Sequence, residues 1–417
     1  MRARRQGWVC VLLSLTLLTG PSPALADDED TAATATPVVG RVVDENGWPL
    51  AELAASLESP DAPIWGDTWT HTDAAGGFRF DLELDTAVSG AQVLLWDDLG
   101  QFADRSLTAP ELTPGVAVDL GTIVLRSFPN IGRSATAVDT TSRAAVRAAY
   151  ARGYAKLVRK EKTPKVHGCT VGVTSIALQR REVAAINYFR SMAGLNPVRL
   201  DSGLSAKATK AALIQAKQRH LNHYPSSSTK CYTAIGGETS ARSNLSYGWV
   251  GARNIGGYIA DPGSHNYPAG HRLWLLNPTM QRYGTGYAGT YNAGYVVADE
   301  PDAFLATSPI PAWLPWPSAG YFPSQLEPGG RWSFTTARSD VDFTRATVAV
   351  RVNGKVVKIR PHLTGGYGYQ AGLTWDFAKR PKVTAKGSVT VAVTVSGISV
   401  RGVTTVNQAY QVILFRA

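Results

Sequence analysis

Histidines in two short segments are the residues of this chain best suited to chemistry. The first segment reads HLNHYP and covers residues 220–225, and the second reads GHR and covers residues 270–272. An imidazole exchanges protons near neutral pH, and its neutral form is a common ligand of zinc. The alternative is that His223 and His271 are structural and bond to backbone groups in a polar cleft. The residues alone therefore predict a cleft with two histidines.

The cysteines offer a second kind of chemistry. Cys169 and Cys231 are the two cysteines that follow the leader segment, and they would close one disulfide in an oxidising compartment. Two free, buried thiols are the alternative. A zinc site built on this pair lacks the second pair of ligands that a structural site requires.

Residues 1–26 have the features of a secretory signal peptide: a basic start, an apolar run too short for a membrane span, and small residues at the end. Its three arginines take the formal net charge from +10 to +7 when it is removed. No later stretch is apolar enough to span a membrane, so we expect a secreted, extracellular protein. The positive charge favours anionic cell-wall polymers or membrane surfaces, or serves solubility alone. Nucleic acid is not an expected partner, because no binding motif is present.

The chain length predicts several domains. Residues 37–126 alternate β-branched runs with turns such as Asn46-Gly47, which predicts an antiparallel β-sandwich. The order GRVVD at 40–44 and GGFRF at 76–80 resembles the carboxypeptidase regulatory-like, prealbumin-type domain, which is usually an accessory to a working domain. Residues 140–166 are rich in Ala, Arg, Lys and Tyr, which predicts a basic helical connector, with a cell-surface contact as the alternative.

Residues 175–300 are the next predicted unit. Periodic apolar residues predict helices at 179–192 and 202–220, the second with a narrow alanine stripe that suits close packing. The stretch EVAAINYFRSMAGLNPVRLD at 182–201 resembles the opening of a CAP domain, the superfamily of cysteine-rich secretory, antigen 5 and pathogenesis-related proteins. The resemblance implies an α-β-α sandwich, which makes the whole chain an α+β multidomain protein.

The motifs that follow resemble this family in order. His223 matches the first cavity histidine, and His271 matches the second. Ser243 and Asn244 lie in a stretch similar to the family's Gly-Glu-Asn-Leu motif, with serine in place of the glutamate, and Asp261 falls near the position of the second family acid. The resemblance implies that these residues line a solvent-open, ligand-binding groove.

Some family members hold zinc or magnesium in this groove. Here the resemblance reduces the ligand set to His223, His271 and Asp261. A zinc ion with three protein ligands keeps an open coordination position, which would suit a zinc-bound water and hydrolysis. Serine at position 243 removes the carboxylate best suited to act as a base, and Glu238 is the nearest substitute. We therefore favour binding over catalysis and assign no catalytic residue.

Residues 309–417 predict a C-terminal β-sandwich. Runs at 347–352, 388–395 and 409–415 alternate apolar and polar residues, as strands with one buried face do. Aromatic residues at 367–375 are expected to pack in the core, with stacking on sugar rings as the alternative.

We predict a secreted binding or adhesion module whose two-histidine groove takes a cell-wall, lipid or metal ligand. One alternative is a zinc-dependent hydrolase that acts on peptide or cell-wall polymer. The other is a structural surface scaffold. Zinc and magnesium are the candidate cofactors, and the sequence gives no oligomeric state.

Overall fold

The computed structural model describes residues 35–44, 47, 49–59, 63–97, 102, 105–125, 133–297, 310–338, 341–384, 387–400 and 404–417. The predicted signal peptide and Asn46 of the first predicted turn lie outside these residues. The chain is α+β and multidomain, as predicted. Within the described residues, no helix has the length and apolar character needed to cross a membrane.

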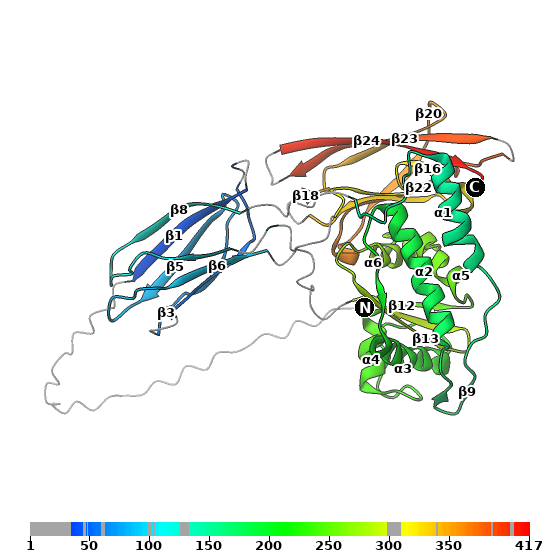
Figure 1. Cartoon of the computed structure of the whole chain (residues 1–417), viewed down its shortest axis with the longest axis horizontal. Coiled ribbons are helices and arrows are strands. Elements are labelled where there is room, and N and C mark those ends of the chain that lie inside the picture. The colour runs from blue at the N-terminus through cyan, green and yellow to red at the C-terminus, as the bar shows by residue number, and fades with distance from the viewer. Residues whose placement is uncertain are drawn as a thin grey trace, which may run out of the picture.

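The N-terminal part consists of two four-stranded sheets with their own core (Figure 1). Val38, Phe80, Leu82 and Val93 are fully buried in this core. The turn before β5 is fixed by Asp73, whose carboxylate accepts hydrogen bonds from the amides of Ala75 and Gly77, both at 2.8 Å. The strands, in sheet order, are β3 (Trp65–Gly66), β5 (Gly77–Glu83), β1 (Thr36–Val43) and β8 (Val118–Val124), then β4 (Trp69–His71), β2 (Ala54–Glu58), β6 (Gln92–Trp96) and β7 (Arg105–Thr108).

The central part is a four-stranded sheet between helices. Its strand order is β11 (Arg199–Leu200), β13 (Arg282–Ala288), β14 (Tyr291–Tyr295) and β12 (Ser243–Tyr247). The helices are α2 (Ile176–Ala193), α3 (Ser202–Gln218), α4 (Ala234–Ala241), α5 (Ala252–Ala260) and α6 (Gly270–Leu275), with a short 3₁₀ turn η2 (Ser264–Asn266). A small hairpin, β9 (Val166–His167) and β10 (Thr170–Val171), precedes α2.

Glycines in β13 decide how closely α3 approaches the sheet. Side chains alternate between the two faces of a strand, so Gly284 and Gly286 share the face that α3 covers. A methyl group at Gly286 would overlap the backbone of Thr209, and one at Gly284 would overlap that of Leu204. The predicted stripe consists of Leu204, Ala208, Ala212 and Ala216. Ala208 and Ala212 are fully buried, as is Ala211, whereas Leu204 and Ala216 are half-buried.

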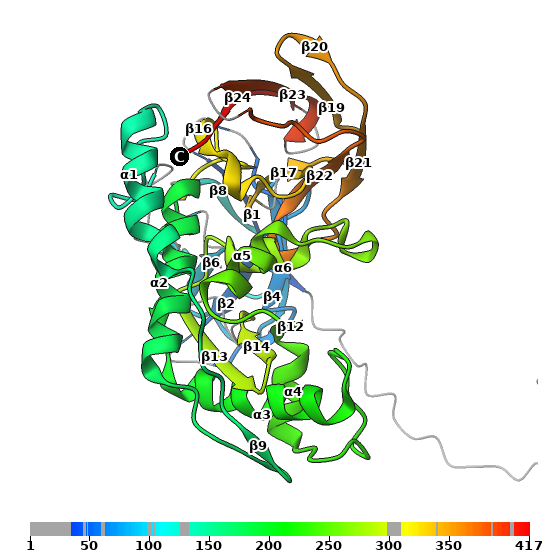
Figure 2. The same cartoon turned by 90° about the vertical axis from the view of Figure 1, so that its right-hand side faces the viewer.

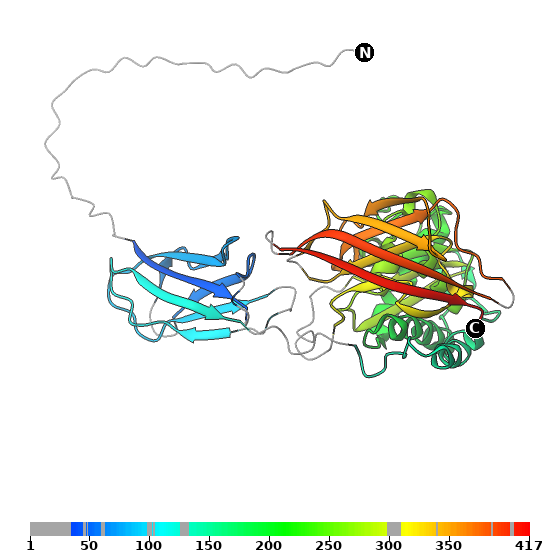
Figure 3. The ribbon, with the colours of Figure 1, turned by 90° about the horizontal axis from the view of Figure 1, so that it is seen from above.

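The C-terminal part holds two further sheets. The first has the order β15 (Leu314–Trp316), β17 (Arg331–Thr336), β22 (Ala371–Phe377) and β21 (Ile359–Leu363). The second has the order β16 (Gly320–Pro323), β24 (Thr404–Phe415), β23 (Ser388–Val400), β19 (Thr347–Val352) and β20 (Lys355–Val356), with β18 (Val341–Asp342) paired to β23. The long strands β23 and β24 cross the end of the molecule, as Figure 3 shows from above. The 3₁₀ turns η4 (Ser324–Leu326) and η5 (Tyr367–Tyr369) complete this part.

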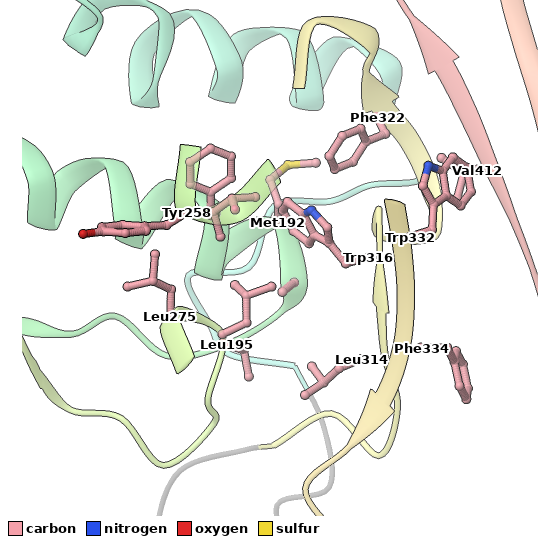
Figure 4. Close-up of a cluster of buried hydrophobic side chains, with 14 of the residues drawn as sticks. Met192, Leu195, Tyr258, Leu275, Leu314, Trp316, Phe322, Trp332, Phe334 and Val412 are labelled. Carbon is pink, nitrogen blue, oxygen red and sulfur yellow. The ribbon is translucent and has the colours of Figure 1, made fainter. Parts of the chain in front are cut away.

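One hydrophobic core runs through both the helical part and the C-terminal sheets. Met192 and Leu275 of the helices are fully buried with Trp316 and Phe322 of the sheets, as Figure 4 shows. The rings of Phe189 and Trp316 lie 5.9 Å apart between centroids. The two regions that we expected as separate units therefore fold on a common core.

The predicted basic helical connector contains helix α1 (Arg143–Gly153) and the 3₁₀ turn η1 (Ala155–Leu157), and one face of it is buried. Ser142 caps α1 by accepting from the amide of Ala145. Val146 is fully buried, and Tyr154 packs against Tyr188 and Phe189 of α2. The apolar face of this segment belongs to the common core, which the spacing of its residues did not reveal because its partners lie far along the chain.

Candidate ligand-binding pocket

His223 follows α3 in a loop that buried amides hold in place. The side-chain amide of Gln215, itself fully buried, donates to the carbonyl of Asn222 and to the hydroxyl of Ser240, both at 3.0 Å. Nδ1 of His223 lies 2.9 Å from the carbonyl oxygen of Ser240. Because a carbonyl only accepts, Nδ1 carries the proton, and Nε2 of the neutral ring is an acceptor.

The pKa of His223 lies below its ordinary value. Burial is the main cause, because it removes water from the charged form, and the nearby His271 adds repulsion. The hydrogen bond to Ser240 opposes both effects. His223 is therefore neutral at pH 7.

His271 lies at the start of α6 and is fixed by Asp261, the residue that ends α5. Nδ1 of His271 is 2.7 Å from Oδ1 of Asp261, and the backbone amide of His271 donates to Oδ2 at 2.9 Å. The ring of Tyr258 stacks on the imidazole with centroids 5.3 Å apart. The side-chain amide of Asn244 donates to the carbonyl of His271 at 2.9 Å. These contacts leave Nε2 of His271 without a bond to any described residue.

The two histidines lie in the wall of a pocket of about 460 Å³. Of the five predicted groove residues, His223, His271, Ser243 and Asn244 line this pocket, and Asp261 does not. Asp261 is 1% exposed and lies behind His271. The other lining residues are Tyr224, Ala241, His265, Asn266, Pro268, Gly270, Trp274, Val296, Val297 and Tyr367.

Ser243 stands out among the lining residues. Its side chain is 3% exposed, and its hydroxyl has no hydrogen-bond partner among the described residues. A buried hydroxyl without a partner costs roughly 1–3 kcal/mol, and its residue lies in the pocket wall, which makes it a candidate contact for a ligand.

The C-terminal sheets build one side of this pocket. Tyr367 in η5 lies against Gly270 at the start of α6. Gly368 adopts φ 65°, and a side chain there would overlap the carbonyl of Leu273, so glycine lets η5 approach α6 closely. Gln370 donates to the same carbonyl at 2.8 Å.

Two arginines join the pocket loop to β17. Arg331 donates to the carbonyls of Asp261 and Gly263 at 2.8 and 2.9 Å. Arg272 is fully buried and donates to the hydroxyl of Ser333 and the carbonyl of Arg331. The turn between Asp261 and His271 is thus held from the C-terminal side, as Figure 2 shows for α6 beside β17 and β22.

A buried polar network continues from the pocket to the opposite side of the sheet. The hydroxyl of Tyr258 shares its one proton between two acceptors, the carbonyl of Asn244 at 3.0 Å and the side-chain oxygen of Asn292 at 2.9 Å. Asn292 also accepts from Asn254, and Glu182 of α2 bonds to the hydroxyl of Tyr287. Complete burial raises the pKa of Glu182 to about 7, against the opposing effect of its hydrogen bonds.

The residues present do not fit the predicted three-ligand metal site. Both carboxylate oxygens of Asp261 are bonded to His271, so Asp261 orients that ring instead of joining it as a ligand. Among the described residues, no group of three or more His, Cys, Asp or Glu side chains could hold a metal ion. His265 also lines the pocket, but it does not complete such a group with His223 and His271. Two imidazoles fall short of the three protein ligands that catalytic zinc sites use.

Other candidates lie away from the pocket. Glu238, the nearest substitute base, is 62% exposed at its side chain and pairs with Arg242 at 3.5 Å. His220 is exposed and bonds to the carbonyl of Gln218. Cys169 and Cys231 form the expected disulfide, with Cα atoms 5.3 Å apart.

Sequence reasoning did not assign ten of the lining residues to the groove, and His265, Trp274 and Tyr367 are among them. His265 and Trp274 lie within the stretch that resembles the family, and their nearness to His271 was the available signal. Tyr367 carried no signal that linked it to the histidines, because it is brought to them by the packing of η5 on α6.

Comparisons with known proteins give one match of interest. No curated protein matches this chain. Among solved structures, a streptococcal ancillary pilin shares 19% identity over 25% of this chain and 35% of its own, with a TM-score of 0.19. A 9R-lipoxygenase from Cyanothece PCC8801 shares 10% identity over 94% of this chain and 44% of its own, with a TM-score of 0.16. The chain thus covers less than half the length of either, and neither likeness informs the fold.

Residues 183–299 match the family model described as CAP, the cysteine-rich secretory protein family, and this match supports the CAP superfamily for that segment.

Proposed function

We propose that this chain is an extracellular binding module whose pocket takes a hydroxyl-rich ligand, a sugar unit of a cell-wall glycan, without a metal. The observation that carries the proposal is the hydroxyl of Ser243, which is buried in the pocket wall and has no partner among the described residues. A ligand that bonds to this hydroxyl would remove the cost of leaving it unpaired.

The other polar groups of the pocket complement hydroxyls. Nε2 of the neutral His223 accepts a hydrogen bond, and Ser243 is free to donate one, so the pair matches groups that both donate and accept. Trp274 and Tyr367 offer ring faces of the kind on which a sugar ring packs. Among the lining residues that the structure describes there is no carboxylate, so these residues offer no counter-charge to a cationic ligand.

The zinc-dependent hydrolase is the weaker candidate. A hydrolase needs a base within reach of its water, and the pocket holds Ser243 where the family has a glutamate. Glu238 points to solvent and pairs with Arg242. The third predicted ligand, Asp261, is committed to His271.

The domain order is part of the proposal. We take residues 37–126 as an accessory β-sandwich, residues 140–166 as the segment that leads into the CAP-like region at 175–300, and residues 309–417 as a β-region that completes the pocket. Residues 1–26 would be removed on export.

Saturation-transfer NMR with short cell-wall-type oligosaccharides tests the pocket. We expect signal from a sugar ring with the wild-type chain and its loss in Ser243→Ala and His223→Gln. His220→Gln is the matched control, because His220 lies three residues from His223 and outside the pocket wall. Equal signal in the pocket variants and wild type would refute the pocket as the glycan site.

A zinc titration by calorimetry separates the two candidates. We expect no stoichiometric binding, because two imidazoles without a third ligand hold zinc weakly. If wild type bound one equivalent of zinc and His271→Ala bound none, the metal-free pocket would be rejected and the hydrolase favoured.

A further inference from the structure

The chain divides into an acidic and a basic part. Residues 36–125 hold 15 Asp and Glu against three Arg and no Lys, whereas residues 126–417 hold 36 Lys and Arg against 13 Asp and Glu. The overall charge of +10 hides this separation. A partner of uniform negative charge would be repelled by the N-terminal sandwich and attracted to the remainder.

The basic residues are densest between residues 140 and 181. This stretch contains ten Lys and Arg and one acid, Glu161. The side chain of Glu161 is 6% exposed, bonds to Arg181 through both oxygens at 2.6 Å, and also accepts from Arg159 at 3.3 Å. The surface of the stretch therefore displays cations without an accessible carboxylate. Six exposed cations follow one another along it and are called the basic stripe: Arg152, Lys156, Arg159, Lys160, Lys162 and Lys165.

Contacts with α2 and with the turn between β13 and β14 hold the segment that carries the basic stripe. At one end, Tyr154 packs on Tyr188 and Phe189. In the middle, Glu161 is fixed by Arg181, and at the far end the carbonyl of Pro164 accepts from the amide of Gly289. Figures 1 and 2 show this segment descending beside α2 from α1 to β9. The cations are thus displayed in a row on a fixed backbone.

We propose that the basic stripe binds a linear polyanion with repeated phosphate groups. In a row of cations, successive side chains can each pair with successive phosphate groups of a linear polymer, and Lys and Arg both bind phosphate well. A bilayer is the poorer match, because Val158, at 36%, is the one large apolar side chain exposed between residues 152 and 165. The basic stripe does not line the pocket that contains His223 and His271, so this proposal is independent of the glycan site.

The test compares two sets of four lysines by fluorescence anisotropy with labelled polyphosphate, using the full chain without residues 1–26. One variant replaces Lys156, Lys160, Lys162 and Lys165 with Gln. The matched control replaces four exposed lysines of the C-terminal sheets with Gln, which removes the same charge from another surface. These lysines are Lys355, Lys358, Lys379 and Lys382.

Wild type should bind with an affinity that falls steeply between 50 and 200 mM salt, as phosphate contacts require. The stripe variant should lose about tenfold or more in affinity. The slope of its log binding constant against log salt concentration should be smaller by about 3, since each phosphate contact contributes roughly 0.7–0.9 to that slope. The control should stay within about twofold of wild type. Unchanged thermal melting of both variants shows that the fold is intact.

Three results would overturn the proposal. Equal losses in the two variants would mean that net charge alone drives binding. An absence of binding by wild type would remove the polymer as a partner. Stripe-dependent binding to anionic phosphatidylglycerol vesicles, without binding to polyphosphate, would assign the stripe to a membrane instead.

Discussion

The carboxylate of Asp261 contacts His271 twice, at Nδ1 at 2.7 Å and at the backbone amide at 2.9 Å. Asp261 ends α5 in a left-handed conformation with φ 49°, which turns the chain so that its side chain reaches the start of α6. The pair sets which nitrogen of His271 carries the proton, and it presents the other nitrogen to the pocket. Asp261 thus acts on a ligand through His271.

Asp261→Asn should weaken ligand binding and lower stability together. The Asn side chain offers a donor where the backbone amide of His271 also donates, so a buried bond is lost at a cost of about 1–3 kcal/mol. Chemical denaturation should show this loss, and saturation-transfer NMR should show a weaker glycan signal. Glu238→Gln is the control, because that carboxylate is exposed and outside the pocket. A variant as stable as wild type and with full binding would disprove the positioning role.

Glu182 should make stability depend on pH. The pKa of this buried carboxyl is raised to about 7 from 4.5, so the native chain keeps a proton that the unfolded chain releases as pH rises between these values. Stability is full below pH 4.5 and falls until about pH 7, by about 3 kcal/mol from this group.

The variant Glu182→Gln isolates this effect, because its amide stays neutral at every pH. The free energy of unfolding is measured in urea from pH 4 to 8 for both chains. The difference between wild type and the variant should change with pH, because only wild type loses stability from this group as the pH rises. Curves that run parallel across this range would show that Glu182 does not keep its proton in the folded chain.

Patterns of neighbouring residues predicted the elements well but not their partners. The helix at 179–192 and the strand at 347–352 were readable, because apolar spacing reports which side of an element is buried. Tyr283 and Tyr287 of β13 are fully buried. The burial of Asp261 could not be read, since it follows from Arg331, 70 residues away, closing over that turn.

Gly286→Ala should destabilise the chain although it adds one methyl group. That methyl would overlap the backbone of Thr209 in α3, and neither the strand nor the helix backbone can yield without shifting the sheet. Overpacking of this kind costs roughly 1–3 kcal/mol. Gly172→Ala is the matched control, because a methyl there makes only ordinary contact, 3.5 Å from Pro164. Equal melting temperatures for the two variants would contradict the close packing of α3 on β13.

Removal of residues 309–417 should prevent the central part from folding. Trp316 and Phe322 belong to the common core, so their loss exposes Met192 and Phe189 of α2. Arg272 is fully buried in the whole chain, and it would lose Ser333 and Arg331 as acceptors and keep only the carbonyls of Ile259 and Ala260, so part of its hydrogen bonding would be lost.

The opposite truncation provides the comparison. Residues 36–125 have a separate core, so a chain that starts at residue 133 should keep the common core and melt cooperatively. Circular dichroism and size-exclusion chromatography on both truncations would distinguish them. A folded, monomeric product of residues 133–308 would show that the C-terminal sheets are dispensable, and it would leave Tyr367 as an addition to a pocket that forms without it.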